Sequence, residues 1–194
     1  MGGVRIIAGG LKGRLIPFEN RKFDDADITP QKVKGAVFSM IGEYLHGQGF
    51  LDLYAGSGQI GIEALSRGAD PVVFNDRDAR RCRFIASYCE GLGMKKQPLV
   101  LNMSAERAVV FLGSRRILFR HIFLDPPYEK IKRGVSVYPD VIRKIGEAGM
   151  LAPDGDIIIQ HFTGNVMDEE IGKYSLTATK RYGRTALSVY SLTP

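Results

Sequence analysis

Apolar residues along the chain follow two alternating patterns. Short continuous apolar runs, typical of buried strands, are separated by longer segments in which apolar residues recur every three or four positions, as in amphipathic helices. The predicted strands occupy residues 50–54, 72–75, 99–102, 120–124 and 156–160. Helices are predicted from Gly58 to a stop at Gly68, and over residues 78–92, 104–112 and 139–148. Continuous apolar strands that alternate with helices indicate a parallel sheet covered on both faces.

The end of the chain departs from this alternation. Two strand patterns, at residues 174–181 and 185–192, flank a turn at Gly183 with no helix between them. Such a pair predicts an antiparallel hairpin, which should close the far edge of the sheet. The sequence therefore predicts an α/β fold, with a Rossmann-like, doubly wound, mostly parallel sheet of seven strands that ends in this C-terminal hairpin.

The start of the chain has its own pattern. A β-branched run at residues 4–7, followed by glycines, predicts a small basic hairpin. Thr29 and Pro30 then predict the start of a helix, with Thr29 as N-cap and Pro30 in the first position. Its apolar stripe runs on to Leu45. We expect two parts: an N-terminal basic extension of residues 1–28, and a main domain of residues 29–194.

The turn after the first predicted strand has the spacing G-x-G-x-x-G, formed by Gly56, Gly58 and Gly61. The first glycine permits a tight turn, the second lets a ligand approach the backbone, and the third lets the helix pack close to the strand. Asp76 ends the next strand, at the place from which a carboxylate can accept both hydroxyls of a ribose. A purely structural turn would require the glycines and the acid to coincide by chance. The pattern predicts a cofactor that carries adenosine, either NAD or S-adenosylmethionine (SAM).

Composition narrows the classes of protein. The chain has 194 residues and a net charge of +6, which is compatible with a polyanionic partner. Basic residues gather before Asp24. No apolar run approaches the roughly 18 residues that a membrane span requires, and no secretory signal is visible. We therefore expect a cytoplasmic protein without a membrane partner.

Cysteine and histidine positions give no metal signature. Cys82 and Cys89 lie seven residues apart, so they share one helix face and are predicted to be core residues. Neither belongs to a C-x-x-C pair, and His46, His121 and His161 are scattered. We predict no metal.

The fourth predicted strand is followed by Asp125, Pro126, Pro127 and Tyr128. Two prolines remove two backbone donors, so the turn offers a carboxylate and carbonyls as acceptors, beside an aromatic ring. A pocket of acceptors suits an amino group, and the ring of Tyr128 suits stacking on a nucleobase. The alternative is a rigid loop whose tyrosine packs on the core. Because ligands of doubly wound sheets bind at the carboxyl ends of the strands, we expect Asp125 to lie beside Asp76 and the glycine turn.

This arrangement predicts methyl transfer to nitrogen. An exocyclic base nitrogen is a poor nucleophile, because its lone pair is delocalised into the ring. If Asp125 and the Pro126 carbonyl hold its two N–H groups, the nitrogen becomes more tetrahedral and its lone pair can meet a methyl donor. The carboxylate stabilises the positive charge that develops, and it can receive the proton. A pocket for an amino group therefore favours SAM over NAD.

These motifs resemble the class I SAM-dependent amino-methyltransferases. Within them, the chain is similar to the bacterial 16S ribosomal RNA (guanine-N2)-methyltransferase family, the D-type small-subunit methylase. The resemblance covers nearly the whole chain, at residues 5–9 and 12–14, at Thr29, Val33, Lys34 and Phe38, at residues 51–58 and 61–69, and at Gly183. Asp-Pro-Pro-Tyr alone is shared with adenine-N6 methylases, whereas the Arg-Ile-Ile opening and the Glu-Ala-Leu-Ser-Arg run are more specific.

The resemblance implies transfer of a methyl group from SAM to the N2 amino group of one guanine in 16S rRNA. The cofactor residues that it implies are Asp52, Ala55, Gly56, Ser57, Gly58, Gly61, Asp76 and Ser104. The residues implied for the target base are Asp125, Pro126 and Tyr128, and those implied for RNA phosphates are Arg5, Lys12 and Arg14. The implied partner is small-subunit rRNA, free or within an assembling 30S subunit, and we expect a monomer.

The chain departs from the family's pattern at three places. Residues 27–30 replace the usual Arg-Pro-Thr-Thr, Ser104 stands where Asp or Asn is frequent, and Gln160 stands where Glu is common. Three other functions compete with the first. These are an adenine-N6 methylase, which here lacks a separate DNA-recognition domain; an NAD-dependent oxidoreductase, which lacks a hydride-relay pair; and a non-catalytic RNA-binding module, against which the intact Asp125 and glycine turn argue.

Overall fold

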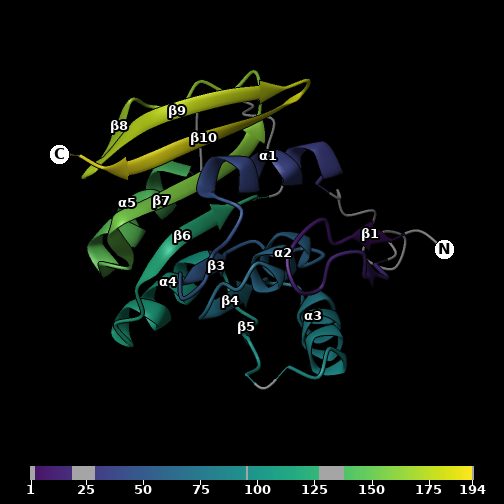
Figure 1. Cartoon of the computed structure of the whole chain (residues 1–194). Helices are drawn as coiled ribbons and strands as arrows, with labels where there is room; N and C mark the ends of the chain where they lie inside the picture. The colour runs from purple at the N-terminus through teal and green to yellow at the C-terminus, as the bar shows by residue number, and fades with distance from the viewer. Residues whose placement is uncertain (1–2, 19–28, 95, 127–137, 194) are drawn as a thin grey trace.

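The computed structural model (Figure 1) describes residues 3–18, 29–94, 96–126 and 138–193. Its centre is an eight-stranded sheet in the order β5-β4-β3-β6-β7-β10-β9-β8. The strands are β3 (Phe50–Asp52), β4 (Val72–Asn75), β5 (Leu99–Leu101), β6 (Phe119–Leu124), β7 (Leu151–Phe162), β8 (Glu170–Ile171), β9 (Tyr174–Tyr182) and β10 (Thr185–Leu192). The strands from β5 to β7 are parallel, and β10, β9 and β8 continue the sheet in antiparallel pairs. The predicted fold is confirmed, and the two-residue strand β8 adds one edge strand to the predicted seven.

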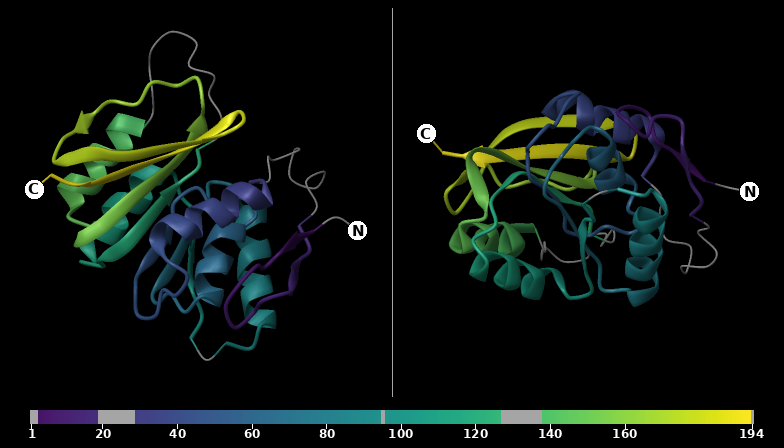
Figure 2. Two further views of the ribbon diagram at one scale, coloured as in Figure 1. Left: turned by 45° about the horizontal axis from the view of Figure 1, so that its top comes forward. Right: turned by 60° about the horizontal axis from the view of Figure 1, so that its bottom comes forward.

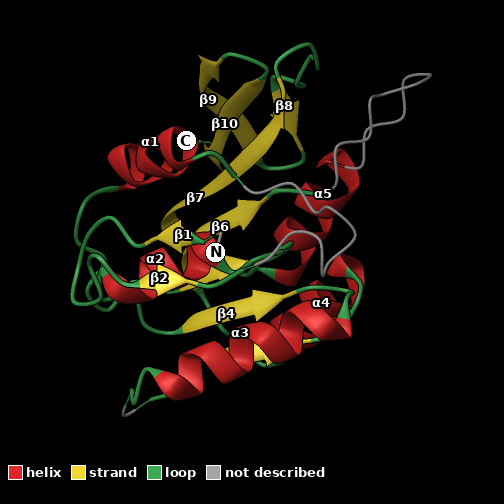
Figure 3. Cartoon of the chain, turned by 90° about the vertical axis from the view of Figure 1, so that its right-hand side faces the viewer, coloured by secondary structure: helices red, strands yellow, loops and turns green. Residues whose placement is uncertain are grey.

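Helices cover both faces of the sheet (Figure 3). They are α1 (Gln31–Ile41), α2 (Gln59–Ser66), α3 (Ala79–Gly91), α4 (Ala105–Ser114) and α5 (Tyr138–Ala148). Successive strand residues point to opposite faces, so Phe50 packs with α1, α2 and α3, whereas Leu51 packs with α4 and α5. Cys82 and Cys89 are buried free thiols on α3, as predicted. No helix in the described part of the chain combines the length and apolar character that crossing a membrane requires.

The predicted N-terminal hairpin is present. Strands β1 (Val4–Arg5) and β2 (Leu15–Ile16) pair antiparallel beside α2 and α3 (Figure 2). Four of its apolar side chains are buried in the same core cluster as α1 and α2: Val4, Ile6, Ile16 and Phe18. The ring of Phe18 also meets that of Phe84 on α3 edge-on, with centroids 5.3 Å apart. The hairpin thus shares the core of the main domain, while the boundary predicted at residue 28 falls outside the described residues.

A buried carboxylate on α2 holds the hairpin in place. Glu63 is fully buried, and its two oxygens accept the backbone N–H groups of Ile7 and Ala8, each at 2.9 Å. The same carboxylate pairs with Lys34 Nζ of α1 and with Arg67, each at 3.2 Å. Lys34 is also fully buried, and this burial lowers the pKa of its ammonium group against the opposing attraction of Glu63. One side chain therefore joins α1, α2 and the hairpin.

Ser66, one turn further along α2, makes a second contact with the hairpin. Its carbonyl accepts the N–H of Gly10 at 2.7 Å, and its hydroxyl accepts the N–H of Leu11 at 3.0 Å. Gly9 has φ +79°, and a Cβ there would lie 1.8 Å from the Ser66 carbonyl oxygen. Only glycine fits this approach of the two backbones.

Two predictions about α1 are wrong. Pro30 occupies the N-cap position, with no side-chain cap, and the hydroxyl of Thr29 donates instead to Asp125. The helix ends at Ile41 because Gly42 follows with φ +106°, which breaks the helical path. Leu45 lies beyond the helix end but is buried in the core. Its apolar side chain is therefore explained by core packing and not by a longer helix.

Candidate active site

A cavity of about 570 Å³ opens at the carboxyl ends of β3, β4, β5 and β6. A volume of this order suits a small-molecule ligand. Eight of the residues predicted for the site line it: Asp52, Ala55, Gly56, Ser57, Asp76, Ser104, Asp125 and Pro126. The predicted meeting of the glycine turn, Asp76 and Asp125 at one sheet edge is confirmed. Tyr128 lies outside the described residues.

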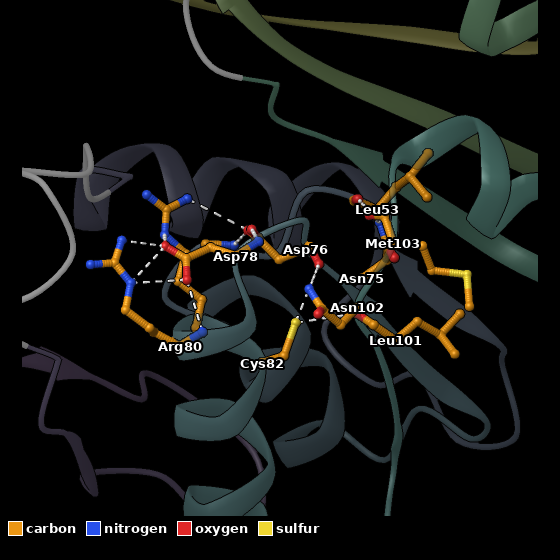
Figure 4. A network of polar contacts seen from close by, with 11 residues as sticks. Leu53, Asn75, Asp76, Asp78, Arg80, Cys82, Leu101, Asn102 and Met103 are labelled. Atoms are coloured by element: carbon orange, nitrogen blue, oxygen red, sulfur yellow. Dashed lines mark hydrogen bonds and ion pairs between the residues drawn. The ribbon is translucent and has the colours of Figure 1, made fainter.

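Asp76 is fixed in place by backbone groups on both sides. Its carboxylate accepts the N–H of Gly56 and the N–H of Asp78, each at 2.8 Å. Its own carbonyl accepts hydrogen bonds from Asn102 Nδ2 at 3.0 Å and from the Cys82 thiol at 3.3 Å (Figure 4). A carboxylate has about four acceptor sites, so two held by backbone N–H groups leave acceptor capacity for the donors of a ligand. The glycine turn and the acid therefore form one rigid unit.

The other two glycines of the turn act in packing. Gly61 lies against the sheet, where a Cβ would come within 2.2 Å of the Phe74 ring, so its predicted role in close helix–strand packing is confirmed. Gly58 is the N-cap of α2, with φ +74°, and a Cβ there would meet Ile85 and Ile62. Gly58 is not among the cavity-lining residues, and the approach of a ligand to its backbone stays a prediction. Glycine is required there for two reasons: the positive φ, and the close packing of neighbouring side chains.

Asp52 links the first strand of the site to α2. Its buried carboxylate accepts the N–H of Gly61 at 3.0 Å and so satisfies one of the free donors of the helix's first turn. Burial raises the pKa of Asp52 to about 7, and the negative charge of Asp76 contributes in the same direction. Asp52 thus orients the helix that bears the glycine turn.

Two acceptors in the lining were missed by the sequence interpretation. Gln59 Oε1 and Asn75 Oδ1 are buried with no hydrogen-bond partner among the described residues. Asn75 Nδ2 donates to the carbonyls of Leu53 and Met103, at 3.1 and 3.3 Å, so its amide is held in place. Buried acceptors without partners are costly, and they fit a site in which a ligand supplies the donors. Both residues flank predicted positions, Gln59 following Gly58 and Asn75 preceding Asp76.

Ser104 both caps α4 and lines the cavity. Its hydroxyl accepts the N–H of Arg107 at 3.4 Å as the N-cap of α4, which confirms the predicted cap. Ser104 also lines the cavity. Backbone N–H donation, and after it a hydrogen bond from Ser104, lower the pKa of Glu106 in the same turn.

Asp125 is half-buried at the end of β6 and receives donors from two other elements. Its Oδ2 accepts Gln160 Nε2 of β7 at 2.9 Å and the hydroxyl of Thr29 at 3.3 Å. Pro126 is buried beside it in the lining. The acceptor turn that the sequence predicted therefore faces the same cavity as the glycine turn. The departure at Gln160 supplies a neutral donor to Asp125.

The three cations predicted for RNA, Arg5, Lys12 and Arg14, lie on the hairpin and not in the cavity. All three hairpin cations are exposed. Arg5 also braces the hairpin, since its Nη1 donates to the carbonyl of Gly13 at 2.9 Å. Among the described residues no group of three or more His, Cys, Asp or Glu side chains could hold a metal ion, and the absence of a metal stays a prediction.

The chain is similar to known proteins over nearly its whole length. A family model described as "Conserved hypothetical protein 95" matches residues 4–191. The chain is 37% identical, over 187 residues, to YlbH of Bacillus subtilis (strain 168), which is provisionally named an rRNA methyltransferase; the match covers 96% of this chain and 98% of YlbH. It is 26% identical, over 191 residues, to ribosomal RNA small subunit methyltransferase D of Escherichia coli (strain K12), covering 97% and 90%.

The fold is also found in a solved structure. HI0767 of Haemophilus influenzae, provisionally described as a methylase, superposes with a TM-score of 0.77 at 26% identity, covering all of both chains. The Rossmann-like sheet with its antiparallel C-terminal hairpin is thus that of a class I methyltransferase.

Proposed function

The chain belongs to the conserved hypothetical protein 95 family and is a SAM-dependent methyltransferase, and we propose that it methylates the exocyclic N2 amino group of a guanine in 16S rRNA. The observation that carries this proposal is the position of Asp125. Its carboxylate and the glycine turn with Asp76 line one cavity. An acceptor for an amino group and a place for an adenosine-bearing donor therefore lie next to each other.

The residues of the cavity fit SAM. Gly56 and Ser57 line the part proposed for its methionine end, Asp76 offers acceptors for the ribose, and Ser104 lies where the adenine is proposed to bind. Gln59 and Asn75 add buried acceptors that match the N–H donors of such a ligand. When bound, SAM supplies an electrophilic methyl group on a sulfonium centre.

The chain's own contribution is to orient and stabilise the target amino group. In this proposal Asp125 and the Pro126 carbonyl accept its two N–H groups and aim the nitrogen lone pair across the cavity. The ionised carboxylate stabilises the positive charge that develops on nitrogen and takes the released proton. Tyr128 remains the proposed stacking partner of the base, from its place in the sequence.

The hairpin cations are proposed to grip RNA phosphates. They are exposed on an element that Glu63 and Ser66 hold rigidly against α2. Rigid docking keeps them at a fixed position relative to the cavity. We propose small-subunit rRNA as the partner, free or within an assembling 30S subunit, and a monomeric enzyme.

The test is incubation of small-subunit rRNA with labelled SAM, followed by nucleoside analysis. N2-methylguanosine is expected, whereas N6-methyladenosine would identify the adenine methylase instead. Asp125→Ala should abolish transfer and leave SAM affinity unchanged, while Glu147→Ala, at an exposed position of α5, should keep the wild-type rate. SAM should raise the melting temperature, because a ligand selective for the native state stabilises it. Stabilisation by NADH and not by SAM would make the methylase proposal wrong.

A further inference from the structure

One oxygen of Asp125 is the meeting point of three elements. Oδ2 accepts the amide of Gln160 at 2.9 Å and the hydroxyl of Thr29 at 3.3 Å. Both donors are buried, with exposed fractions of 2% for Gln160 and 6% for Thr29. Thr29 and Gln160 lie 96 and 35 residues from Asp125 in the chain, so tertiary structure alone brings them there.

The fold explains both contacts. Strands β6 and β7 are parallel and pair Leu124 with Ile159, so the next residues, Asp125 and Gln160, continue side by side. Thr29 precedes α1, and its hydroxyl is available because Pro30 takes the N-cap position. The hydroxyl that the local sequence assigns to helix capping is therefore used at the cavity.

We propose that Thr29 and Gln160 are positioning residues for the reaction, which fix the orientation of the Asp125 carboxylate toward the target amino group. This inference rests on the proposed function, because it assigns the two residues a role in methyl transfer through Asp125.

The torsion that rotates a carboxylate about its last bond is broad, so an aspartate side chain has no intrinsic preference for one plane. Hydrogen bonds to an ionised acceptor are stronger than neutral ones. The bonds to Oδ2 from Gln160 of β7, at 2.9 Å, and from Thr29 before α1, at 3.3 Å, restrict that plane and with it the direction of the second oxygen. Catalysis depends on such placement, since a misplacement of about 1 Å can cost roughly a hundredfold in rate.

The chemical type of the two donors supports this role. An amide and a hydroxyl are both neutral, so they hold the carboxylate without cancelling its charge. Neither donor therefore reduces the negative charge that stabilises the cation forming on the amino nitrogen. A lysine or arginine in either place would form an ion pair and weaken that effect.

A merely structural role would predict a different result. If the two bonds only tied α1 and β7 to β6, their loss would lower stability and leave the rate of the folded enzyme unchanged. A positioning role predicts a fall in kcat at saturating SAM and RNA, with SAM affinity preserved.

The experiment compares Thr29→Val, which removes the hydroxyl at nearly constant shape, with Thr29→Ser, which keeps it. Gln160→Met removes the second donor and keeps the side-chain length. We expect kcat for methylation of small-subunit rRNA to fall by about tenfold to a hundredfold in Thr29→Val and Gln160→Met, and to stay within about threefold of wild type in Thr29→Ser. SAM affinity, measured by calorimetry, should change by less than about twofold in all three.

The matched control is Thr177→Val, which removes a hydroxyl bonded to the Val189 carbonyl in the C-terminal hairpin and should keep the wild-type kcat. Wild-type kcat in both Thr29→Val and Gln160→Met would overturn the positioning role while the wild type still makes N2-methylguanosine. If Gln160→Met does not fold, the kcat values of Thr29→Val and Thr29→Ser are sufficient for the test. If the wild type transfers no methyl group to small-subunit rRNA, both the proposed function and this inference are overturned.

Discussion

Replacing Glu63 by glutamine tests how the N-terminal hairpin is held. The substitution removes the negative charge that faces the fully buried Lys34 at 3.2 Å. Breaking a buried ion pair from one side costs about 3–5 kcal/mol, because the other charge is left without compensation. One amide oxygen also cannot replace both carboxylate oxygens that accept the N–H groups of Ile7 and Ala8. Since these losses share one site and do not add fully, we expect a destabilisation of at least about 3 kcal/mol.

The assay is urea unfolding followed by far-ultraviolet circular dichroism, since the chain has no tryptophan to report by fluorescence. Lys34→Met should also destabilise, and the double variant Glu63→Gln/Lys34→Met should cost less than the sum of the two by about 1 kcal/mol or more. Glu147→Gln on the surface is the control and should stay within about 0.5 kcal/mol of wild type. In the Glu63→Gln variant, the amide hydrogens of Ile7 and Ala8 should exchange faster.

Two results would refute this account of the hairpin. A cost below about 1 kcal/mol for Glu63→Gln would show that the charge pair is not buried in solution as it is in the structure. Strictly additive effects of the two substitutions would show that Glu63 and Lys34 do not interact.

Three further predictions concern RNA, pH and packing. Replacing the hairpin cations by alanine should reduce the slope of log affinity for rRNA against log salt by about 2–3, since each lost phosphate contact removes roughly 0.7–0.9; an unchanged slope would show that they do not touch phosphates. Burial lowers the pKa of His121 to about 4, so its contribution to stability is present above pH 6.5 and is lost as pH falls through 4. The loss is on the order of 3 kcal/mol, and unfolding curves at pH 7 and pH 4 should show it in the wild type and not in His121→Gln. Gly61→Ala should cost about 1–3 kcal/mol of stability and weaken SAM binding, because its Cβ would meet the Phe74 ring. The control is Gly91→Ala, where an added Cβ meets open space. Equal melting temperatures of the two variants would contradict the packing argument.

Periodicity predicted most of the fold correctly because the central strands β3, β4 and β6 are buried on both faces. The run at residues 72–75 became β4 with the same bounds, since every residue in it is buried. The site at the sheet edge was also predictable, because the glycine turn, Asp76 and Asp125 each follow such a strand directly. Parallel topology then brings these strand ends together without any further information in the sequence.

What the sequence could not show are side chains whose partners lie far along the chain. Thr29 has the local pattern of an N-cap, and only the folded chain reveals that Asp125 competes for its hydroxyl. Glu63 and Arg67 have the spacing of an exposed helical ion pair, yet both are buried because the hairpin and α1 cover them. In both cases a tertiary contact overrides what the local sequence favours.

The contact between the hairpin and α2 has a consequence for how such an enzyme can diverge. Glu63 and Ser66 recognise the hairpin mainly through backbone N–H groups, and at Gly9 the close approach of the two backbones excludes any side chain. This contact therefore does not depend on the outward-facing side chains of the hairpin. A hairpin transplanted from a relative should dock as well as the resident one, provided that it keeps this glycine and its buried apolar residues. Evolution can in this way exchange the surface proposed to bind RNA while the cavity stays unaltered.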